Sequence, residues 1–150
     1  WARIDASVDW HPPDHRSFLG KTDDLYPPHC VRDTTGADFI PGLNVDRFHA
    51  IWRKGFQRDF EAYAVTAQHP GMFALYRESK VNTVVVCGIA TNICCFFAAR
   101  DFARAGFRIL IVEDASAGID VPAAGLFQAK AKEEGLSLGI EYVNTDYFAE

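Results

Sequence analysis

The order of segments in the second half of the chain constrains its fold more than any other feature of the sequence. Three apolar, β-branched runs predict strands, and two segments of helical composition lie between them. In chain order these segments are 81–86, 92–105, 107–112, 122–134 and 138–143. Each helical segment is followed by a glycine, Gly106 or Gly135, which predicts its end. A strand-helix-strand-helix-strand order requires parallel strands joined by right-handed crossovers. Because the strands are apolar without alternation, we expect a three-layer α/β fold in which helices flank a parallel sheet on both faces.

The first half of the chain is less regular. We predict strands at 4–8 and 48–52 and a helix at 70–80. The segment 11–45 separates the two strands and is rich in Pro, Gly, Asp and His, and a loop of this length in a compact domain is usually functional. Because no repeat or linker interrupts the chain, residues 1–150 are expected to form a single domain.

Composition excludes several classes of partner. The 150 residues include 15 basic and 20 acidic side chains, a formal net charge of -5, without any basic run, so neither a nucleic acid nor an anionic membrane is expected to bind. No apolar stretch approaches the roughly 20 residues of a membrane-spanning helix, and the segment after Trp1 lacks the features of a secretory signal. The 4 cysteines are too few for a disulfide framework, so we expect a soluble protein in the reducing cytoplasm.

Reactive side chains follow three of the predicted strands. Asp9 and His11 come after the first strand, Lys54 comes after the second, and the segment 88–94 comes after the third. In an open parallel sheet, ligands bind outside the carboxyl ends of the strands. We therefore expect these side chains to gather at one edge of the sheet and to form the functional site.

Cys94 is the candidate nucleophile. Thr91 is a good N-cap residue, which predicts that Cys94 lies in the first turn of a helix. There the helix dipole favours a thiolate, and backbone N–H groups can bind an oxyanion. Position alone supports a small buried residue about equally well. Cys95 points about 100° away around the helix, and together with Cys30 and Cys87 it is expected to pack in the interior.

Lys54, Asp9 and His11 suggest a site with charged and metal-binding groups. A lysine at the carboxyl end of a strand can hold a nearby cysteine as a thiolate, and the alternative is a solvated surface lysine. Asp9 and His11 are two residues apart, so both project to the same side of an extended backbone. A later histidine such as His29 could complete a set of one carboxylate and two imidazoles on a divalent metal. Spacing alone also leaves a chance arrangement open.

Two strings are specific enough to suggest a family. They are Asp9-Trp10-His11-Pro12 and Gly88-Ile89-Ala90-Thr91-Asn92-Ile93-Cys94. With these strings the chain resembles the nicotinamidases of the isochorismatase-like cysteine hydrolases. The matching segments, in the order of the family, are 7–18, 27–31, 54–55 and 88–94. Isochorismatases share the fold but lack the metal-binding Asp-x-His and the loop histidine, so the resemblance is to the nicotinamidase branch.

The resemblance implies a role for each catalytic candidate. Cys94 is implied to be the nucleophile and Lys54 a triad member that supports its thiolate. The backbone N–H groups of Ala90 and Cys94 are implied to form the oxyanion hole, beside a cis peptide bond that precedes Ala90. Tyr26 is implied to pack on the pyridine ring of the substrate, and Tyr63 is expected to line the same pocket.

The resemblance also implies a cofactor and a reaction. Asp9, His11 and His29 are implied to bind one divalent metal ion, with zinc preferred and iron or manganese as alternatives. His15 is a ligand in some members and lies only near the metal in others, and its short spacing from Asp9 favours the second role. The implied reaction is the hydrolysis of nicotinamide to nicotinate and ammonia through a cysteine thioester, in NAD salvage. Related enzymes are often homo-oligomers.

One motif of the family is absent. Its third catalytic residue is an aspartate in an Asp-x-Gln-x-Asp-Phe string at the end of the first strand, and that string does not occur in residues 1–150. Residues 1–8 align with the second strand of the family, which implies an N-terminally incomplete domain that lacks its first strand. Without this general base, the chain is expected to hydrolyse nicotinamide poorly. Two alternatives stay open: another hydrolase of small amides in the same superfamily, and an inactive metal- or ligand-binding relative.

Overall fold

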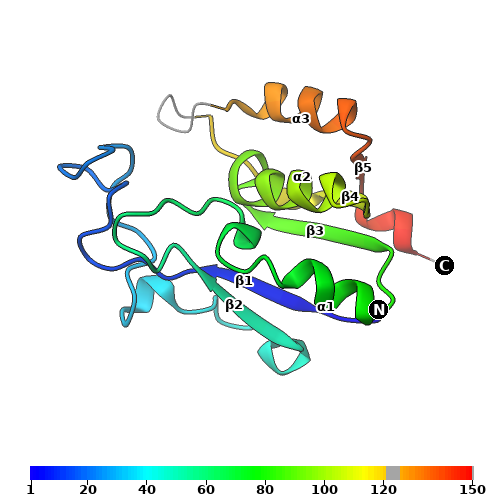
Figure 1. The fold of residues 1–150 in the computed structure, drawn as a ribbon, viewed down its shortest axis with the longest axis horizontal. Coiled ribbons are helices and arrows are strands. Elements are labelled where there is room, and N and C mark those ends of the chain that lie inside the picture. Colours follow the sequence, from blue (N-terminus) through cyan, green and yellow to red (C-terminus); the bar gives the residue numbers. More distant parts are fainter. Residues whose placement is uncertain (121–125, 150) are drawn as a thin grey trace. The chain divides into compact units, whose positions relative to one another are not determined.

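The computed structural model describes residues 1–120 and 126–149, and the chain divides into two compact units, Trp1–His69 and Pro70–Glu150. The strands of the first unit form a two-stranded sheet and those of the second unit a three-stranded sheet (Figure 1). All the strand pairs in both sheets are parallel. The predicted architecture of parallel strands flanked by helices is therefore confirmed, whereas the single domain over residues 1–150 stays a prediction.

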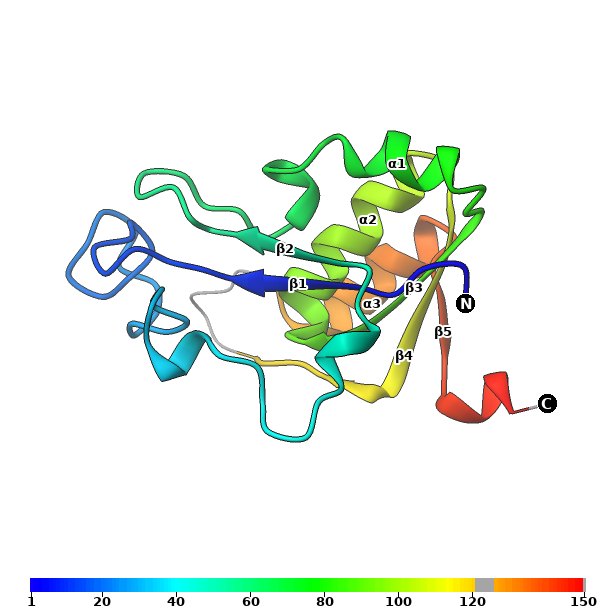
Figure 2. The same cartoon turned by 90° about the horizontal axis from the view of Figure 1, so that it is seen from below.

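In the first unit, β1 (Asp5–Asp9) and β2 (Ala50–Lys54) pair in parallel and lie side by side in both ribbon views (Figures 1 and 2). Their register places Asp9 opposite Lys54. The second strand begins two residues later than predicted, because Phe48 still donates its N–H to the preceding 3₁₀ turn. The register brings the carboxyl ends of both strands, and the residues that follow them, to one edge of this small sheet.

The long segment between β1 and β2 is irregular but ordered by local contacts. Two 3₁₀ turns, Thr35–Ala37 and Val45–Arg47, interrupt it. An isolated β-bridge pairs His11 with Val31, so the chain returns to the end of β1 after the loop. Phe18 is 1% exposed and forms the apolar centre of the loop. The predicted functional loop therefore has its own small core.

The second unit contains the predicted strand-helix alternation. Its elements are α1 (Met72–Glu78), β3 (Thr83–Ile89), α2 (Phe96–Arg104), β4 (Arg108–Ala117), α3 (Gln128–Ser137) and β5 (Glu141–Val143). The strand order is β3-β4-β5, and α2 packs against β3 and β4 (Figure 1). Residues 109–112 of β4 are all buried, as expected for a strand that is covered on both faces. Phe102 of α2 stacks on Tyr76 of α1 with 5.2 Å between ring centroids, which ties the two helices together.

Both ends of α3 differ from the prediction. The segment 121–125, at which the helix was expected to begin, lies outside the described residues. Within the described residues the helix begins at Gln128, whose backbone N–H is accepted by the Asp120 carboxylate at 2.7 Å. The predicted end at Gly135 is wrong, because the helix continues to Ser137 and the left-handed residue is Gly139, with φ of 77°. Gly135 instead makes room for a side chain of β5.

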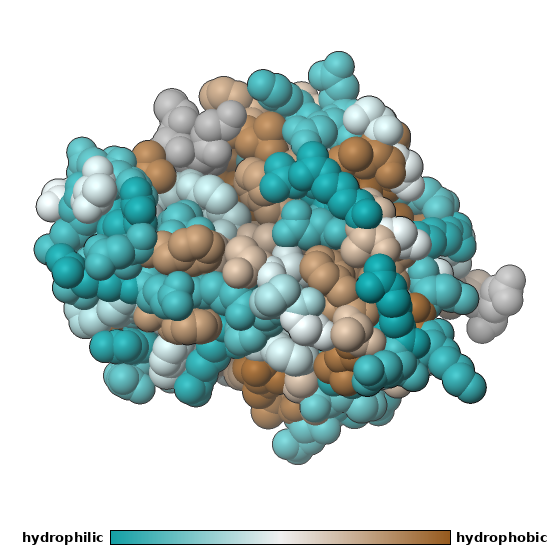
Figure 3. All heavy atoms as spheres, in the orientation of Figure 1, coloured by the Kyte–Doolittle hydropathy of each residue, from teal (hydrophilic) through white to brown (hydrophobic). Residues whose placement is uncertain are grey.

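The surface mixes polar and apolar residues. On the face shown in Figure 3, hydrophobic residues are interspersed among hydrophilic ones. Exposed apolar side chains in the first unit include Ile40, at 73%, and Ile51, at 49%. In the described part of the chain, no helix combines the length and the hydrophobicity needed to cross a bilayer.

The position of Gly135 leads to a stability prediction. A Cβ atom there would lie 2.3 Å from the hydroxyl oxygen of Tyr142. Gly135→Ala is therefore expected to lower the free energy of unfolding by about 1–3 kcal/mol, because overpacking outweighs the gain in helix propensity. Adding Tyr142→Phe, which removes the hydroxyl group, should recover most of the loss. Urea unfolding of the two single variants and the double variant measures this coupling, and purely additive effects would contradict the prediction.

Candidate functional site

Asp9, His11 and His29 form a cluster of metal-binding side chains in the first unit. One ligand atom from each residue lies within 4.8 Å of the other two. Asp9 ends β1, His11 follows two residues later, and His29 comes from the loop that returns to the bridge at Val31. These three residues, called the Asp–His–His cluster below, are the set that the sequence predicted as metal ligands.

Backbone carbonyl groups fix the tautomers of both histidines in the cluster. The Nδ1 atom of His11 lies 3.0 Å from the carbonyl oxygen of Gly55, and the Nδ1 atom of His29 lies 2.9 Å from that of Pro27. Because a carbonyl oxygen only accepts, each Nδ1 carries the proton and each Nε2 keeps its lone pair. Burial lowers the pKa of His11 to about 4, so this imidazole is neutral at pH 7. His11 is therefore in the form that binds a metal ion through Nε2.

His15 lies next to the cluster with both ring nitrogens engaged. It is completely buried, and its ring centroid is 4.3 Å from that of His11. Its Nε2–H group donates to the carbonyl oxygen of Phe60 at 3.2 Å, and its Nδ1 atom accepts from the Ser17 hydroxyl at 2.7 Å. A metal bond would require one of these hydrogen bonds to break. The geometry therefore favours a supporting position for His15 over direct ligation.

Lys54 is buried at the end of β2, with 4% exposure, so it is not a solvated surface lysine. Its ammonium group donates to the carboxylate of Asp9 and to the carbonyl oxygen of Ala62, the latter at 3.2 Å. A carboxylate has about four lone-pair positions, so Asp9 can accept from Lys54 and still bind a metal ion. The neighbouring Arg53 is exposed, and its guanidinium lies 3.9 Å above the ring of Trp10.

Tyr26 and Tyr63 lie together although 37 residues separate them in the chain. Their hydroxyl oxygens are 3.3 Å apart, and the ring of Tyr26 is 5.8 Å from that of His29. Both side chains are half-buried. The structure thus places the two predicted substrate-binding tyrosines beside the Asp–His–His cluster.

Cys94 lies in the second unit, on a wide turn that joins β3 to α2. The turn Thr91–Cys95 is π-helical, and the N–H of Cys95 donates to the carbonyl oxygen of Ala90 at 3.2 Å. The predicted N-cap is wrong: Ala90 takes this position, and Thr91 is already inside the turn. The peptide bond that precedes Ala90 is cis, as the family resemblance implies.

The four cysteines differ in exposure. Cys94 and Cys30 are half-buried, and Cys95 is buried, which agrees with its predicted packing role. Cys87 is exposed, so its predicted burial is wrong. The register between β3 and β4 shifts between Val86 and Gly88, and this irregularity falls at Cys87.

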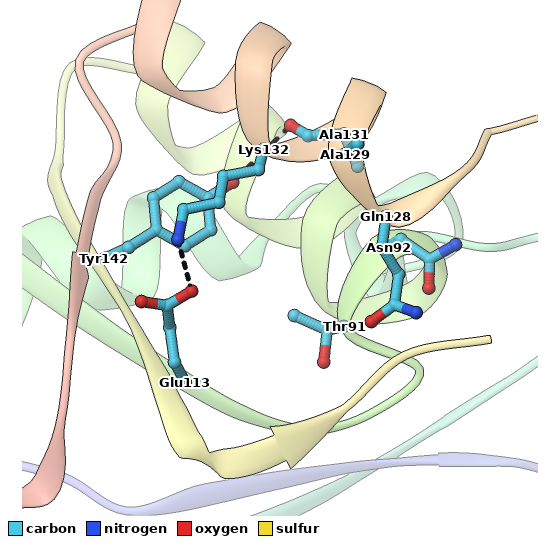
Figure 4. A pocket seen from close by; sticks show the side chains of 8 residues that line it. All are labelled: Thr91, Asn92, Glu113, Gln128, Ala129, Ala131, Lys132 and Tyr142. Carbon is cyan, nitrogen blue, oxygen red and sulfur yellow. Dashed lines mark hydrogen bonds and ion pairs between the residues drawn. The ribbon is translucent and has the colours of Figure 1, made fainter. Parts of the chain in front are cut away.

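A hollow in the second unit lies beside the turn that contains Cys94 (Figure 4). On its wall, the ammonium nitrogen of Lys132 donates to Oε1 of Glu113 at 2.5 Å. The same ammonium group lies over the ring of Tyr142. The side-chain amide of Asn92 is fully engaged, with hydrogen bonds to the backbone of Ile119 and Leu126. The ion pair neutralises both charges, so the hollow presents no unbalanced charge to a ligand.

The Asp–His–His cluster fits a divalent transition metal. One carboxylate and two imidazoles form a common donor set for such ions, and bonds of about 2.0–2.2 Å place two ligand atoms roughly 3–4 Å apart. The Nε2 atom of His11 lies 3.9 Å from Oδ1 of Asp9, at the wide end of this range. With His29 included, the three ligand atoms lie within 4.8 Å of one another, slightly wider than a bound ion requires.

Sequence reasoning did not identify two residues that support the cluster. Gly55 adopts φ of 68° and accepts from His11, and Gln68 accepts from the N–H of Gly55 at 2.6 Å. The Lys54-Gly55 string could have identified Gly55. No motif in the sequence includes Gln68, which lies 13 residues after Gly55.

Parallel strands flanked by helices, with one carboxylate and two imidazoles at a strand end, define an α/β protein with a divalent metal site. The isochorismatase domain matches the chain over residues 8–127. This chain belongs to the isochorismatase family.

Nicotinamidases are among its relatives. The nicotinamidase of Acinetobacter baylyi is 31% identical over 95% of this chain and 74% of its own length. The solved structure of the Acinetobacter baumanii nicotinamidase and pyrazinamidase has a TM-score of 0.87 and 28% identity, and covers 99% of this chain and 80% of that one. A pyrazinamidase of Pyrococcus horikoshii in complex with zinc has a TM-score of 0.77 and 34% identity, over 95% of this chain and 75% of that one.

Four further curated nicotinamidases, one of which is also named a pyrazinamidase, are 24% to 33% identical to this chain, which spans 63% to 67% of their length. These homologues and the solved neighbours support a nicotinamidase function, that is, a hydrolase that acts on an amide. The zinc-bound neighbour and the Asp–His–His cluster together support a divalent metal.

The close approach of Gly55 to His11 yields a prediction about metal binding. A Cβ atom on Gly55 would lie 2.3 Å from Cε1 of His11. Gly55→Ala is expected to displace the imidazole and to weaken Zn²⁺ binding roughly 10- to 100-fold, the usual effect of disturbing a group that orients a ligand. Gly42→Ala is the matched control, because Gly42 also has a positive φ, 88°, but has open space around it. Competition with a chromogenic chelator measures both affinities, and an equal effect of the two variants would show that backbone strain alone is responsible.

Proposed function

We propose that this chain supplies the nucleophile and the metal ligands of a nicotinamidase, which hydrolyses nicotinamide to nicotinate and ammonia. The Asp–His–His cluster is the observation that carries the proposal. It offers a metal site for a ring nitrogen beside two tyrosines, which is what a planar pyridine amide requires. The nicotinamidase relatives support the same substrate.

In this proposal Asp9, His11 and His29 hold one divalent ion, with zinc preferred and iron or manganese as alternatives. When bound, the ion supplies a Lewis acid for the pyridine nitrogen of the substrate. Tyr26 packs on the pyridine ring, and Tyr63 lines the same pocket. The tautomers fixed by backbone carbonyls keep both imidazoles ready to bind the ion.

Cys94 is the nucleophile in this proposal. Its thiolate sulfur bonds to the carboxamide carbon, and the carbonyl electron pair moves to the oxygen, which the N–H groups of Ala90 and Cys94 stabilise. When the oxyanion collapses, the C–N bond breaks, the nitrogen takes, through solvent, the proton that the Cys94 thiol gave up on ionisation, and ammonia leaves. Water then adds to the thioester, the C–S bond breaks, and a proton of this water restores the thiol as nicotinate leaves. The ammonium of Lys54 favours the thiolate form.

Cysteine labelling tests the proposal without depending on turnover. With Zn²⁺ present, iodoacetamide should alkylate Cys94, the proposed nucleophile, faster than Cys87 and the buried Cys95, because desolvation raises the pKa of the Cys87 thiol and Cys95 is inaccessible. Nicotinaldehyde should protect Cys94, since its carbonyl carbon accepts the thiolate and its ring nitrogen matches the metal site. Mass spectrometry of peptides measures the rate at each cysteine.

Benzaldehyde is the matched control, because it lacks the ring nitrogen. Protection by nicotinaldehyde, and not by benzaldehyde, that is lost with EDTA is the expected result. A Cys94 thiol that reacts no faster than Cys87 and is not protected would instead favour an inactive ligand-binding protein. Protection by ureido acids, and not by nicotinaldehyde, would favour a hydrolase of carbamoyl compounds.

The cellular setting follows from the same proposal. Hydrolysis of nicotinamide belongs to NAD salvage, and the low cysteine content, 4 of 150 residues, supports a reducing, cytoplasmic compartment. A homo-oligomer is the state expected from the family resemblance. Size-exclusion chromatography with light scattering measures it directly.

A further inference from the structure

Lys54 and Gly55 contact the metal-ligand segment at three points. The carbonyl oxygen of Lys54 accepts from the N–H of Trp10 at 2.8 Å, and the carbonyl oxygen of Gly55 accepts from Nδ1 of His11 at 3.0 Å. The Lys54 ammonium donates to the carboxylate of Asp9. The two carbonyl groups belong to successive peptide units that meet at the Cα atom of Gly55, so the backbone conformation of Gly55 sets the direction of the carbonyl group that His11 contacts.

Gln68 holds the remaining polar group of the Lys54–Gly55 peptide, the N–H of Gly55. The Oε1 atom of Gln68 accepts from this N–H at 2.6 Å. Its Nε2 atom is buried and makes no hydrogen bond within the described residues. A buried donor without a partner is unfavourable, so the stabilising contact of this side chain is the one that its oxygen makes with the backbone of Gly55.

We infer that Gln68 is a positioning residue for the metal site: by holding the N–H of Gly55, it aims the Gly55 carbonyl at His11 and thereby fixes the tautomer that binds metal. The role in metal binding rests on the proposed function, whereas the effect of Gln68 on the His11 tautomer concerns the metal-free chain. Gln68 itself touches neither the ion nor the substrate.

The physical reason is the conformational freedom of glycine. Gly55 has φ of 68° and no side chain to restrict it, so hydrogen bonds to its N–H and carbonyl groups hold the two peptide units in place. Without the Gln68 acceptor, the buried N–H of Gly55 must find another partner, and the change in the φ and ψ angles of Gly55 that this requires redirects its carbonyl group. His11 then loses its carbonyl acceptor, and the tautomer with the proton on Nε2, which cannot bind a metal through that atom, becomes accessible. Removing such a supporting group typically weakens metal binding roughly 10- to 100-fold.

Three variants separate this role from a general effect on stability. Gln68→Met removes the acceptor at nearly constant size. Gln68→Glu keeps an acceptor oxygen and removes the donor that has no partner. Gln57→Met makes the same chemical change at an exposed glutamine in the same loop region. Gln68→Asn, which shortens the side chain by one methylene, replaces Gln68→Met if the latter does not fold.

The first measurement is Zn²⁺ affinity, obtained by competition with a chromogenic chelator, together with thermal unfolding of the metal-free protein. Gln68→Met should bind Zn²⁺ roughly 10- to 100-fold more weakly than the parent chain, Gln68→Glu should restore binding to within about threefold, and Gln57→Met should have no effect. Wild-type affinity in Gln68→Met would overturn the inference. So would a Gln68→Glu variant that binds as weakly as Gln68→Met.

The second measurement is the tautomer of His11 in the metal-free protein, read from the ¹⁵N shifts of its ring. The parent chain and Gln68→Glu should show the proton on Nδ1, and Gln68→Met should show a mixture of tautomers. An unchanged His11 spectrum in Gln68→Met would overturn the inference even if metal binding fell. If the parent chain bound no Zn²⁺ at all, the proposed function would lose its metal site, while this spectrum would still decide the role of Gln68.

Discussion

The parallel register of β1 and β2 is the constraint on which the geometry of the first unit depends. It sets Asp9 opposite Lys54, so the two strands end together and the residues that follow them form hydrogen bonds with each other. From there the backbone of Trp10 bonds to Lys54, and the ring of His11 bonds to Gly55. A slip of one residue would turn each side chain to the other face of the sheet and would separate the metal ligands from the groups that orient them.

The buried pair of Lys54 and Asp9 illustrates why this register matters. Removing two charges from water is costly, and the cost is offset only by close geometry and additional hydrogen bonds. The carbonyl oxygen of Ala62 gives Lys54 such an additional acceptor. Asp9 faces both an ammonium group and the metal position, so its negative charge is shared between them. Substitution of Asp9 would leave the buried ammonium of Lys54 without its carboxylate, which makes the pair sensitive to mutation.

The sequence predicted which side chains of the first unit lie together better than it predicted local boundaries. The Asp-x-His spacing, the loop histidine and the Lys-Gly string identified groups that the fold brings together in the first unit, because strand ends gather side chains at one edge. The N-cap at Thr91 and the end of α3 at Gly135 were misplaced. At Gly135 the hydroxyl of Tyr142 occupies the space beside the glycine, which is a tertiary contact, and the turn around Cys94 is wider than the α-helical one that the N-cap rule assumes.

The sequence by itself determined the α/β class and the candidate ligands, since the period of its apolar segments and its short motifs are local properties of the chain. Only the tertiary structure decided the tautomers, the hydrogen-bond partners and the burial of those side chains. The tautomers of His11 and His29, the engaged ring of His15 and the burial of Lys54 depend on backbone carbonyls and side chains that are distant in the chain or have no motif. Gln68 is the clearest case, because its effect reaches the metal site through a hydrogen bond to a glycine peptide, and such a contact leaves no pattern in the sequence.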